Sequence, residues 1–311
     1  MSDMLPQLIQ QCFNGLSLGA IYALIAIGYT IVYGIIGMIN FAHGEIYMVG
    51  AYVGVVALAA MGTQAGAPVA TVALLIGAAV LISVLVTGTF GYSTEKVAYR
   101  PLRQSPRLVA LISAIGMSIT LQNYVALGQG AKDMAAPSLV TGGFVFHLGT
   151  DFDVNISYGR LMIIVVTVLL MIALTLFIKY SRTGRASRAC SQDLRMANLL
   201  GIDTNKIISS MFVLGAVLAA VGGVLYALTF IKISPFIGFI AGIKAFTAAV
   251  LGGIGSIPGA MLGGVILGLA ETFAAAYISA EYKDIVSFGL LVLILLFKPT
   301  GLLGKPEVEK V

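Results

Sequence analysis

Charged residues are scarce in this sequence. Asp, Glu, Lys and Arg make up 10% of its 311 residues, whereas 59% are hydrophobic, and the mean hydropathy is +1.01. A single soluble core cannot bury this much apolar side chain, so the composition excludes an ordinary soluble domain. It predicts a polytopic membrane protein embedded in a lipid bilayer.

Cysteine and histidine are almost absent as well. Cys12 and Cys190 have neither CxxC nor metal-ligand spacing, so the sequence supports neither a disulfide framework nor a zinc site. His43 and His147 lie far apart and do not form a catalytic constellation. We therefore expect a protein that is not an enzyme and binds no metal.

Nucleotide-binding motifs are missing too. The nearest candidate for a phosphate-binding loop ends at Gly304-Lys305 but has Pro299 where the first glycine is required. The glycine-rich stretch 252–260 fails the dinucleotide fingerprint because Pro258 occupies the third glycine position. We expect no cofactor in this chain. The basic residues lie in short interruptions between apolar runs, which argues against nucleic-acid binding.

No basic residue precedes Lys96, so the first apolar run lacks the basic start of a signal peptide and is expected to remain as a span. A helix crosses a bilayer core with about 20 apolar residues. Six runs meet this length, at 15–36, 40–61, 69–91, 108–128, 161–179 and 207–231.

The last third of the chain is less regular. Residues 241–254 and 285–297 are short for a crossing, whereas 257–279 is long enough. Glycines and a proline interrupt the chain between the first two of these helices and predict a broken or re-entrant pair over 241–279: Gly252, Gly253, Gly255 and Pro258. The predicted fold is an all-α transmembrane bundle of eight to nine membrane segments, forming one domain over 1–311.

The basic residues predict the orientation of this bundle. The loops 92–107 and 179–206 and the tail from Lys298 hold 13 of the 18 Lys and Arg residues. The loop 129–157 has only Lys132, against Asp133, Asp151 and Asp153. By the positive-inside rule the first group is cytoplasmic, and counting back from Lys96 places the N-terminus outside.

The most polar long stretch is 182–203. Topology alone explains a basic loop, but a helix over 186–200 would also carry a small apolar stripe made of Ala186, Cys190, Leu194 and Ala197. Gly201 would end that helix in a left-handed conformation. A short amphipathic helix of this kind suits docking into a groove on a partner protein.

His43 and Glu45 are the only ionisable side chains between Asp3 and Glu95 apart from tyrosines and Cys12, and apolar runs flank them. Such residues usually face protein or a wet cavity. One interpretation places them in a headgroup-level turn or a polar clamp. The other places Asn40, Phe41, His43 and Glu45, with the glycine-rich turn, along a gated pathway.

Lys244 and Glu271 lie at similar depth if the chain reverses near Ser256, so they can form a buried ion pair or, alternatively, each reach toward the outer headgroups. Pairs of glycines four residues apart, such as Gly264 and Gly268, are interpreted as close helix packing.

Three stretches resemble one family: "YGIIGMINFAHGEIYMVGAY" at 33–52, "RACSQDLRMANLLGI" at 188–202 and "GIKAFTAAVLGGIGSIPGA" at 242–260. The chain resembles the permease subunit of bacterial high-affinity branched-chain amino acid importers of the ATP-binding cassette class. The resemblance extends over nearly the whole chain. It implies a multi-pass protein of the inner membrane that moves leucine, isoleucine and valine by alternating access.

The resemblance also implies partners: a second related permease, two cytoplasmic ATPase subunits that use the ATP, and a periplasmic amino-acid-binding protein. The segment 180–206 would couple the ATPases to the permease, through Arg185, Arg188, Ala189, Asp193, Leu194, Ala197 and Gly201. Arg195 departs from the wider importer pattern, which has Glu six residues before this glycine. A urea or short-amide importer and an ion-coupled secondary transporter remain alternatives.

Overall fold

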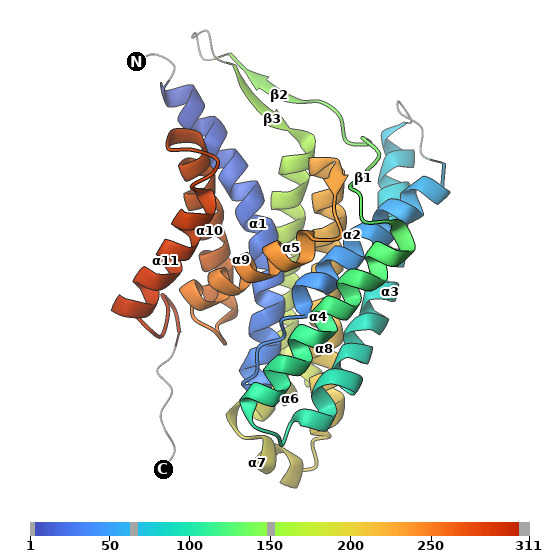
Figure 1. Ribbon diagram of the computed structural model, residues 1–311, viewed down its shortest axis with the longest axis vertical. Coiled ribbons are helices and arrows are strands. Elements are labelled where there is room, and N and C mark those ends of the chain that lie inside the picture. Colours follow the sequence, from blue (N-terminus) through green and yellow to red (C-terminus); the bar gives the residue numbers. More distant parts are fainter. Residues whose placement is uncertain (1–3, 63–67, 148–152, 305–311) are drawn as a thin grey trace.

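The computed structural model describes residues 4–62, 68–147 and 153–304 (Figure 1). Helices dominate, and in chain order they are α1 (Met4–Ile36), α2 (His43–Ala60), α3 (Val69–Thr94), α4 (Arg107–Gln129), α5 (Tyr158–Tyr180), α6 (Arg182–Gln192), α7 (Leu194–Leu199), α8 (Thr204–Phe230), α9 (Ile237–Gly252), α10 (Ile257–Tyr277) and α11 (Lys283–Phe297). A π-helical turn, η1 (Glu95–Tyr99), and a 3-10 turn, η2 (Arg100–Leu102), follow α3.

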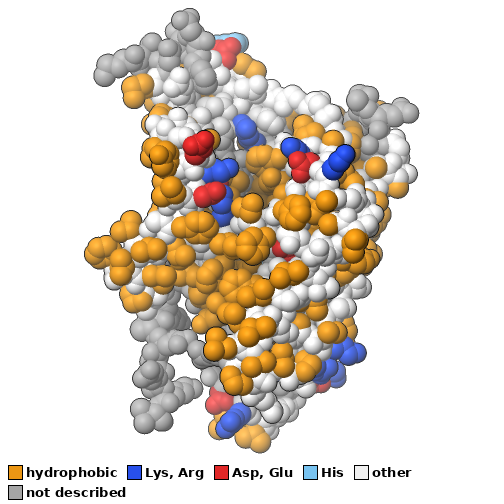
Figure 2. Space-filling model, viewed as in Figure 1, with side chains coloured by type: hydrophobic (Ala, Val, Ile, Leu, Met, Phe, Trp, Pro, Cys, Tyr) orange, Lys and Arg blue, Asp and Glu red, His pale blue; other side chains and the backbone are white. Residues whose placement is uncertain are grey.

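Within the described residues, seven helices are long and apolar enough to cross a membrane, and α9 is a shorter apolar helix of 16 residues. Figure 2 shows hydrophobic side chains across the middle of one face, with charged side chains mainly above and below them. The prediction of a polytopic helical membrane protein is confirmed.

Helices α1, α2 and α8 form the centre of the bundle. In the most apolar 18-residue window of α1, 83% of the residues are buried inside the chain, against 11% for α3. Helices α4 and α5 are as peripheral as α3 and leave many large apolar side chains exposed. The outer helices are therefore the ones available to lipid or to another membrane subunit.

Glycines bring α1 and α10 into backbone contact. A Cβ on Gly19 would lie 2.8 Å from the carbonyl oxygen of Gly264, and one on Gly15 would lie 2.9 Å from the Cα of Leu269. Small residues let two helices approach this closely where lipid gives no hydrophobic drive to associate. The predicted packing role of the 264–268 glycine pair is thus seen directly.

Four short strands were not expected. β1 (Met134–Ala135) pairs with β4 (Lys232–Ile233), and β2 (Gly143–Phe146) pairs with β3 (Val154–Ser157), both antiparallel. Two to four residues per strand are too few to produce a clear alternating pattern in the sequence. β2 and β3 lie at the upper end of the molecule, and β1 lies lower, beside the upper part of the helices (Figure 1).

The two basic loops lie at the same end of the molecule, as expected. Arg103 Nη1, just after η2, donates a 2.7 Å hydrogen bond to Asn205 Oδ1. α1 begins at the opposite end from α6 and α7 (Figure 1), which agrees with an outer N-terminus. Lys305, Lys310 and Asp151, which entered the orientation argument, lie outside the described residues.

Candidate coupling segment and translocation site

The segment between α5 and α8 consists of two short helices, so the expectation of one helix over 186–200 is wrong. Asp193 interrupts it with an extended backbone (φ −158°, ψ 110°). The carboxylate of Asp193 then accepts hydrogen bonds from the backbone N–H groups of Arg195 and Met196 and caps α7. Gly201 follows α7 with φ +83°, as predicted for the helix end.

Two arginines of α6 form hydrogen bonds with the end of α5. Arg188 Nη1 donates to the carbonyl oxygens of Ile178 (2.7 Å) and Lys179 (3.2 Å), and Arg185 Nη1 donates to that of Tyr180 (2.7 Å). A positive charge at these C-terminal carbonyls also suits the helix dipole. Both arginines therefore connect α6 to the end of α5.

The small apolar stripe faces the core of this chain, which corrects the expectation that it faces a partner. Cys190 and Ala197 are 1% and 2% exposed and belong to the main core, and Leu194 packs against it. Burial raises the pKa of the Cys190 thiol. Ala189 is half-buried. Sequence periodicity identified the apolar face, but only tertiary packing decides what covers it.

The exposed apolar surface of the segment is instead the tip of α7. Met196, Leu199 and Leu200 are 58%, 81% and 80% exposed, and α7 lies at the lower end of the molecule in Figure 1. We define Met196, Leu199 and Leu200 as the α7 tip.

The "NFAHGE" stretch lies inside the bundle and not at headgroup level. His43 is 1% exposed, its ring lies 5.1 Å from that of Tyr29, and it fills the space that a Cβ on Gly28 would need. Gly28 is eight residues, or about 12 Å, before the end of α1. The chain therefore turns back into the bundle after α1, and a headgroup-level turn is wrong.

Its other polar members hold this turn in place. Tyr99 in η1 donates 3.1 Å hydrogen bonds to Asn40 Oδ1 and to the carbonyl oxygen of Ile39. Glu45, 1% exposed, accepts a 3.2 Å bond from the hydroxyl of Ser118 in α4, while its Oε2 has no hydrogen-bond partner among the described residues. These contacts connect α2 to η1 and α4, as a polar clamp would.

Phe41 lies beside a cavity of about 510 Å³ between α1, α4 and α9. Its ring packs 5.9 Å from that of Phe246. Ser118 and Tyr29 line the same cavity, which places the clamp next to open space. The structure thus brings the four polar and aromatic residues of this stretch to one region of the bundle.

The predicted glycine-rich turn separates α9 from α10, so the chain is broken there as expected. Gly253 (φ +106°) packs against Gly301 and Gly304, and Gly255 has φ +92°. Gly252 contacts Gly259, and Pro258 starts α10. The backbone of 302–303 donates to the carbonyls of Leu251 and Gly252, covering the turn. A Cβ on Gly34, near the end of α1, would lie 3.8 Å from the Cα of Gly255, so the turn lies beside the end of α1.

Lys244 and Glu271 lie together in the interior. Lys244 Nζ is 2.5 Å from Glu271 Oε1 and 2.7 Å from Asp284 Oδ1, and Tyr22 donates a 2.9 Å hydrogen bond to Glu271 Oε2. Lys244 and Glu271 are each 4% exposed. The alternative in which each reaches outward to the headgroups is therefore wrong for this structure. We call these four residues the charged cluster.

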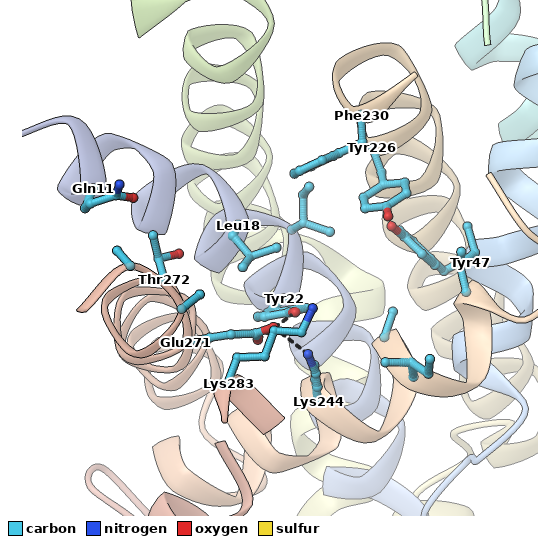
Figure 3. Close-up of a pocket in the computed structure, with 16 residues that line it drawn as sticks. Gln11, Leu18, Tyr22, Tyr47, Tyr226, Phe230, Lys244, Glu271, Thr272 and Lys283 are labelled. Carbon is cyan, nitrogen blue, oxygen red and sulfur yellow. Dashed lines mark hydrogen bonds and ion pairs between the residues drawn. The ribbon is translucent and has the colours of Figure 1, made fainter. Parts of the chain in front are cut away.

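The charged cluster borders a cavity of about 600 Å³ between α1, α2, α8, α9 and α10 (Figure 3). Tyr22 and Asp284 were missed in the sequence, because they join Lys244 and Glu271 only through contacts between helices far apart in the chain. Tyr47, Tyr226 and Phe230 on the far side of the cavity were missed for the same reason. The only signal in the sequence for this site was that charged residues are rare in the apolar runs, which drew attention to Lys244 and Glu271.

Comparison with known proteins agrees with the resemblance. The family model described as branched-chain amino acid transport system / permease component matches residues 11–295. The high-affinity branched-chain amino acid transport system permease protein LivH of Escherichia coli (strain K12) is 57% identical over 314 residues, covering 100% of both chains. The permease protein BraD of Pseudomonas aeruginosa is 60% identical over 306 residues, covering 97% of this chain and 98% of its own.

A more distant relative is the high-affinity branched-chain amino acid transport system permease protein LivM of Salmonella typhimurium, 26% identical over 93% of this chain and 69% of its own. No solved structure gives a significant match. Because the family model covers most of the chain and relatives near 60% identity cover all of it, the chain belongs to the family of permease components of branched-chain amino acid transport systems.

Proposed function

We propose that this protein is a permease subunit of an ATP-driven importer that carries leucine, isoleucine and valine across the bacterial inner membrane. The observation that carries the proposal is the 57–60% identity over the full chain with LivH and BraD, whose names state this transport. A urea or short-amide importer is disfavoured by the same observation. Few buried charges along the helices argue against an ion-coupled transporter.

The proposed complex contains a second related permease, two cytoplasmic ATPase subunits and a periplasmic amino-acid-binding protein. The likeness to LivM supports the second permease as a partner, because LivM is named for the same transport and is related to this chain in sequence. ATP would bind to the ATPase subunits, and this chain would bind no cofactor. High affinity would belong to the binding protein, because a tight site inside the membrane would slow release.

Coupling would use the cytoplasmic segment 180–206. The α7 tip would enter a groove on an ATPase, and its movement would pass through Asp193 and α6 to α5, to whose end Arg185 and Arg188 are bonded. Asp203 caps α8 by accepting from the backbone N–H of Lys206, which lowers the pKa of this carboxyl. Both ends of the segment are thus tied to membrane helices, α5 and α8.

The substrate range tests this function. In membrane vesicles with the whole importer, uptake of labelled leucine is expected to be suppressed by excess isoleucine or valine and unaffected by urea or acetamide. Deleting the gene for this permease is expected to abolish that uptake. Leucine uptake that persists without this chain, or that urea suppresses as well as valine does, would refute the proposal.

The clamp around Glu45 makes a separate prediction. Glu45→Gln preserves an acceptor for Ser118, so we expect assembly and leucine uptake within about twofold of wild type. Glu45→Leu leaves that buried hydroxyl without its acceptor, which costs about 1–3 kcal/mol, and is expected to lower the yield of assembled complex. Assembled yield and uptake are measured together. Tenfold lower uptake by a fully assembled Glu45→Gln complex would instead assign Glu45 to a gate.

A further inference from the structure

The 600 Å³ cavity beside the charged cluster has the size and lining of a small-molecule site. Its volume lies within the range of ligand pockets, which are mainly apolar with a few converging polar groups. Leu18, Ile21, Ile237 and Ile240 contribute apolar surface. Figure 2 shows positive and negative side chains gathered around a hollow in the upper part of this face.

The two sides of the cavity differ in chemistry. In Figure 3, Lys244, Glu271 and Tyr22 converge on one side, and Tyr226 with Phe230 stands on the other. The rings of Tyr226 and Phe230 stack with centroids 4.6 Å apart, and Tyr47 packs edge-on to Tyr226 at 6.0 Å. A ligand in this space would meet paired opposite charges at one end and aromatic and aliphatic surface at the other.

The cluster lies near the end of α10 and the start of α11. Lys244 is seven residues into α9, or about 10 Å from its start, and Glu271 is six residues, or about 9 Å, before the end of α10. Asp284 is in the first turn of α11, and its side chain is 51% exposed, whereas those of Lys244 and Glu271 are 5% exposed. The half-exposed acid and the buried pair behind it therefore extend from the protein surface into the interior.

We propose that this cavity is a transient site for the amino acid zwitterion, in which the Lys244–Glu271 pair opens and exchanges partners with the substrate. Lys244 takes the substrate carboxylate and Glu271 takes the ammonium group, while the aliphatic and aromatic wall takes the branched side chain. Asp284 meets the ammonium group first, at the mouth. This inference rests on the proposed function and names the site where the cargo passes through this chain.

Charge balance makes such an exchange feasible inside the membrane. Lys244 and Lys283 carry two positive charges beside the cavity, and Glu271 and Asp284 carry two negative ones. A zwitterion adds no net charge, and every ion that loses a partner gains another, so no unpaired charge is left in the interior. Because one protein ion pair must open first, binding is weak, as passage requires.

Photo-crosslinking with a diazirine analogue of leucine tests the site in the assembled wild-type importer. We expect labelling at cavity residues of α1 and α9, such as Leu18 and Ile240. An excess of unlabelled leucine, at least tenfold over the analogue, is expected to suppress this labelling. Two single-charge analogues, 3-methylbutylamine and 4-methylpentanoate, are expected to suppress it at least tenfold less well. Suppressible labelling elsewhere in this chain and none at the cavity would overturn the inference.

The double variant K244M/E271Q gives a second measurement. It removes both charges, and its glutamine still accepts from Tyr22, so a pair with only a structural role would allow wild-type uptake once the complex assembles. We expect an assembled complex with at least tenfold lower leucine uptake and cavity labelling. The matched control is K232M/D133N, an exposed 2.8 Å ion pair outside the cavity, which is expected to stay within twofold of wild type.

The two proposals fail in different ways. Wild-type vesicles that import no leucine would refute the proposed function. Wild-type import that continues within twofold in assembled K244M/E271Q would overturn only the cavity site.

Discussion

Replacing Gly268 by leucine is expected to abolish the folded permease, whereas the same replacement at Gly116 is expected to leave it intact. A side chain on Gly268 has no room, because its Cβ would overlap the backbone of Gly19 and lie 2.7 Å from the carbonyl oxygen of Gly15. These neighbours are backbone atoms of a central helix and cannot rotate aside. α1 and α10 would have to separate along their whole contact.

Gly116 is the matched control because it is also a helical glycine, in α4, with nothing within 4 Å of its Cβ position. The measurement is the yield of monodisperse protein after detergent extraction, by fluorescence-detected size exclusion. We expect less than a tenth of the wild-type yield for Gly268→Leu and at least half of it for Gly116→Leu. Equal yields for the two variants would contradict the packing of α1 against α10.

Replacing Leu199 and Leu200 by aspartate is expected to separate the permease from its ATPase subunits without unfolding it. Both side chains are about 80% exposed, so little is lost in the isolated chain. Burial of one leucine contributes about 1.5–3 kcal/mol, and two charges in place of two such residues would weaken docking at least tenfold. Copurification of the ATPase subunits and ATP-dependent leucine uptake should both fall accordingly.

The matched control for the α7 tip is M4D/L5D. Met4 and Leu5 are exposed apolar residues, 63% and 64%, at the opposite end of the bundle. This variant makes the same chemical change and is expected to retain the ATPase subunits. If L199D/L200D copurified with ATPase subunits as well as M4D/L5D does, the α7 tip would not be the docking surface.

The sequence predicted most of the bundle because long apolar runs respond to a single requirement, the bilayer. It placed the start of α1 eleven residues too late, since Gln7, Gln10 and Gln11 are polar. In the structure Gln10 donates to Asn14 Oδ1 (3.1 Å) along the same helix, so polar residues continue α1 beyond its apolar part. Hydropathy therefore identifies the part of α1 that is apolar enough for the bilayer, whereas the helix itself extends beyond that part.

The site was only partly predictable. The Lys244–Glu271 pairing followed from residue counting around a turn, because helical rise fixes depth. The break at Asp193 had a signal that was not used, since aspartate before an apolar helix is a preferred N-cap. The inward direction of the Cys190 and Ala197 stripe, and the convergence of Tyr22 and Asp284 on the pair, depend on packing between distant helices and had no local signal.

This permease is expected to move its cargo uphill only when a separate ATPase acts on the segment 180–206. The most direct test of this expectation is accumulation of labelled leucine in proteoliposomes that contain the permease pair and the binding protein, with or without the ATPase subunits, in the presence of ATP. Leucine is expected to accumulate above its external concentration only when the ATPase subunits are present. Equal accumulation in their absence would contradict it.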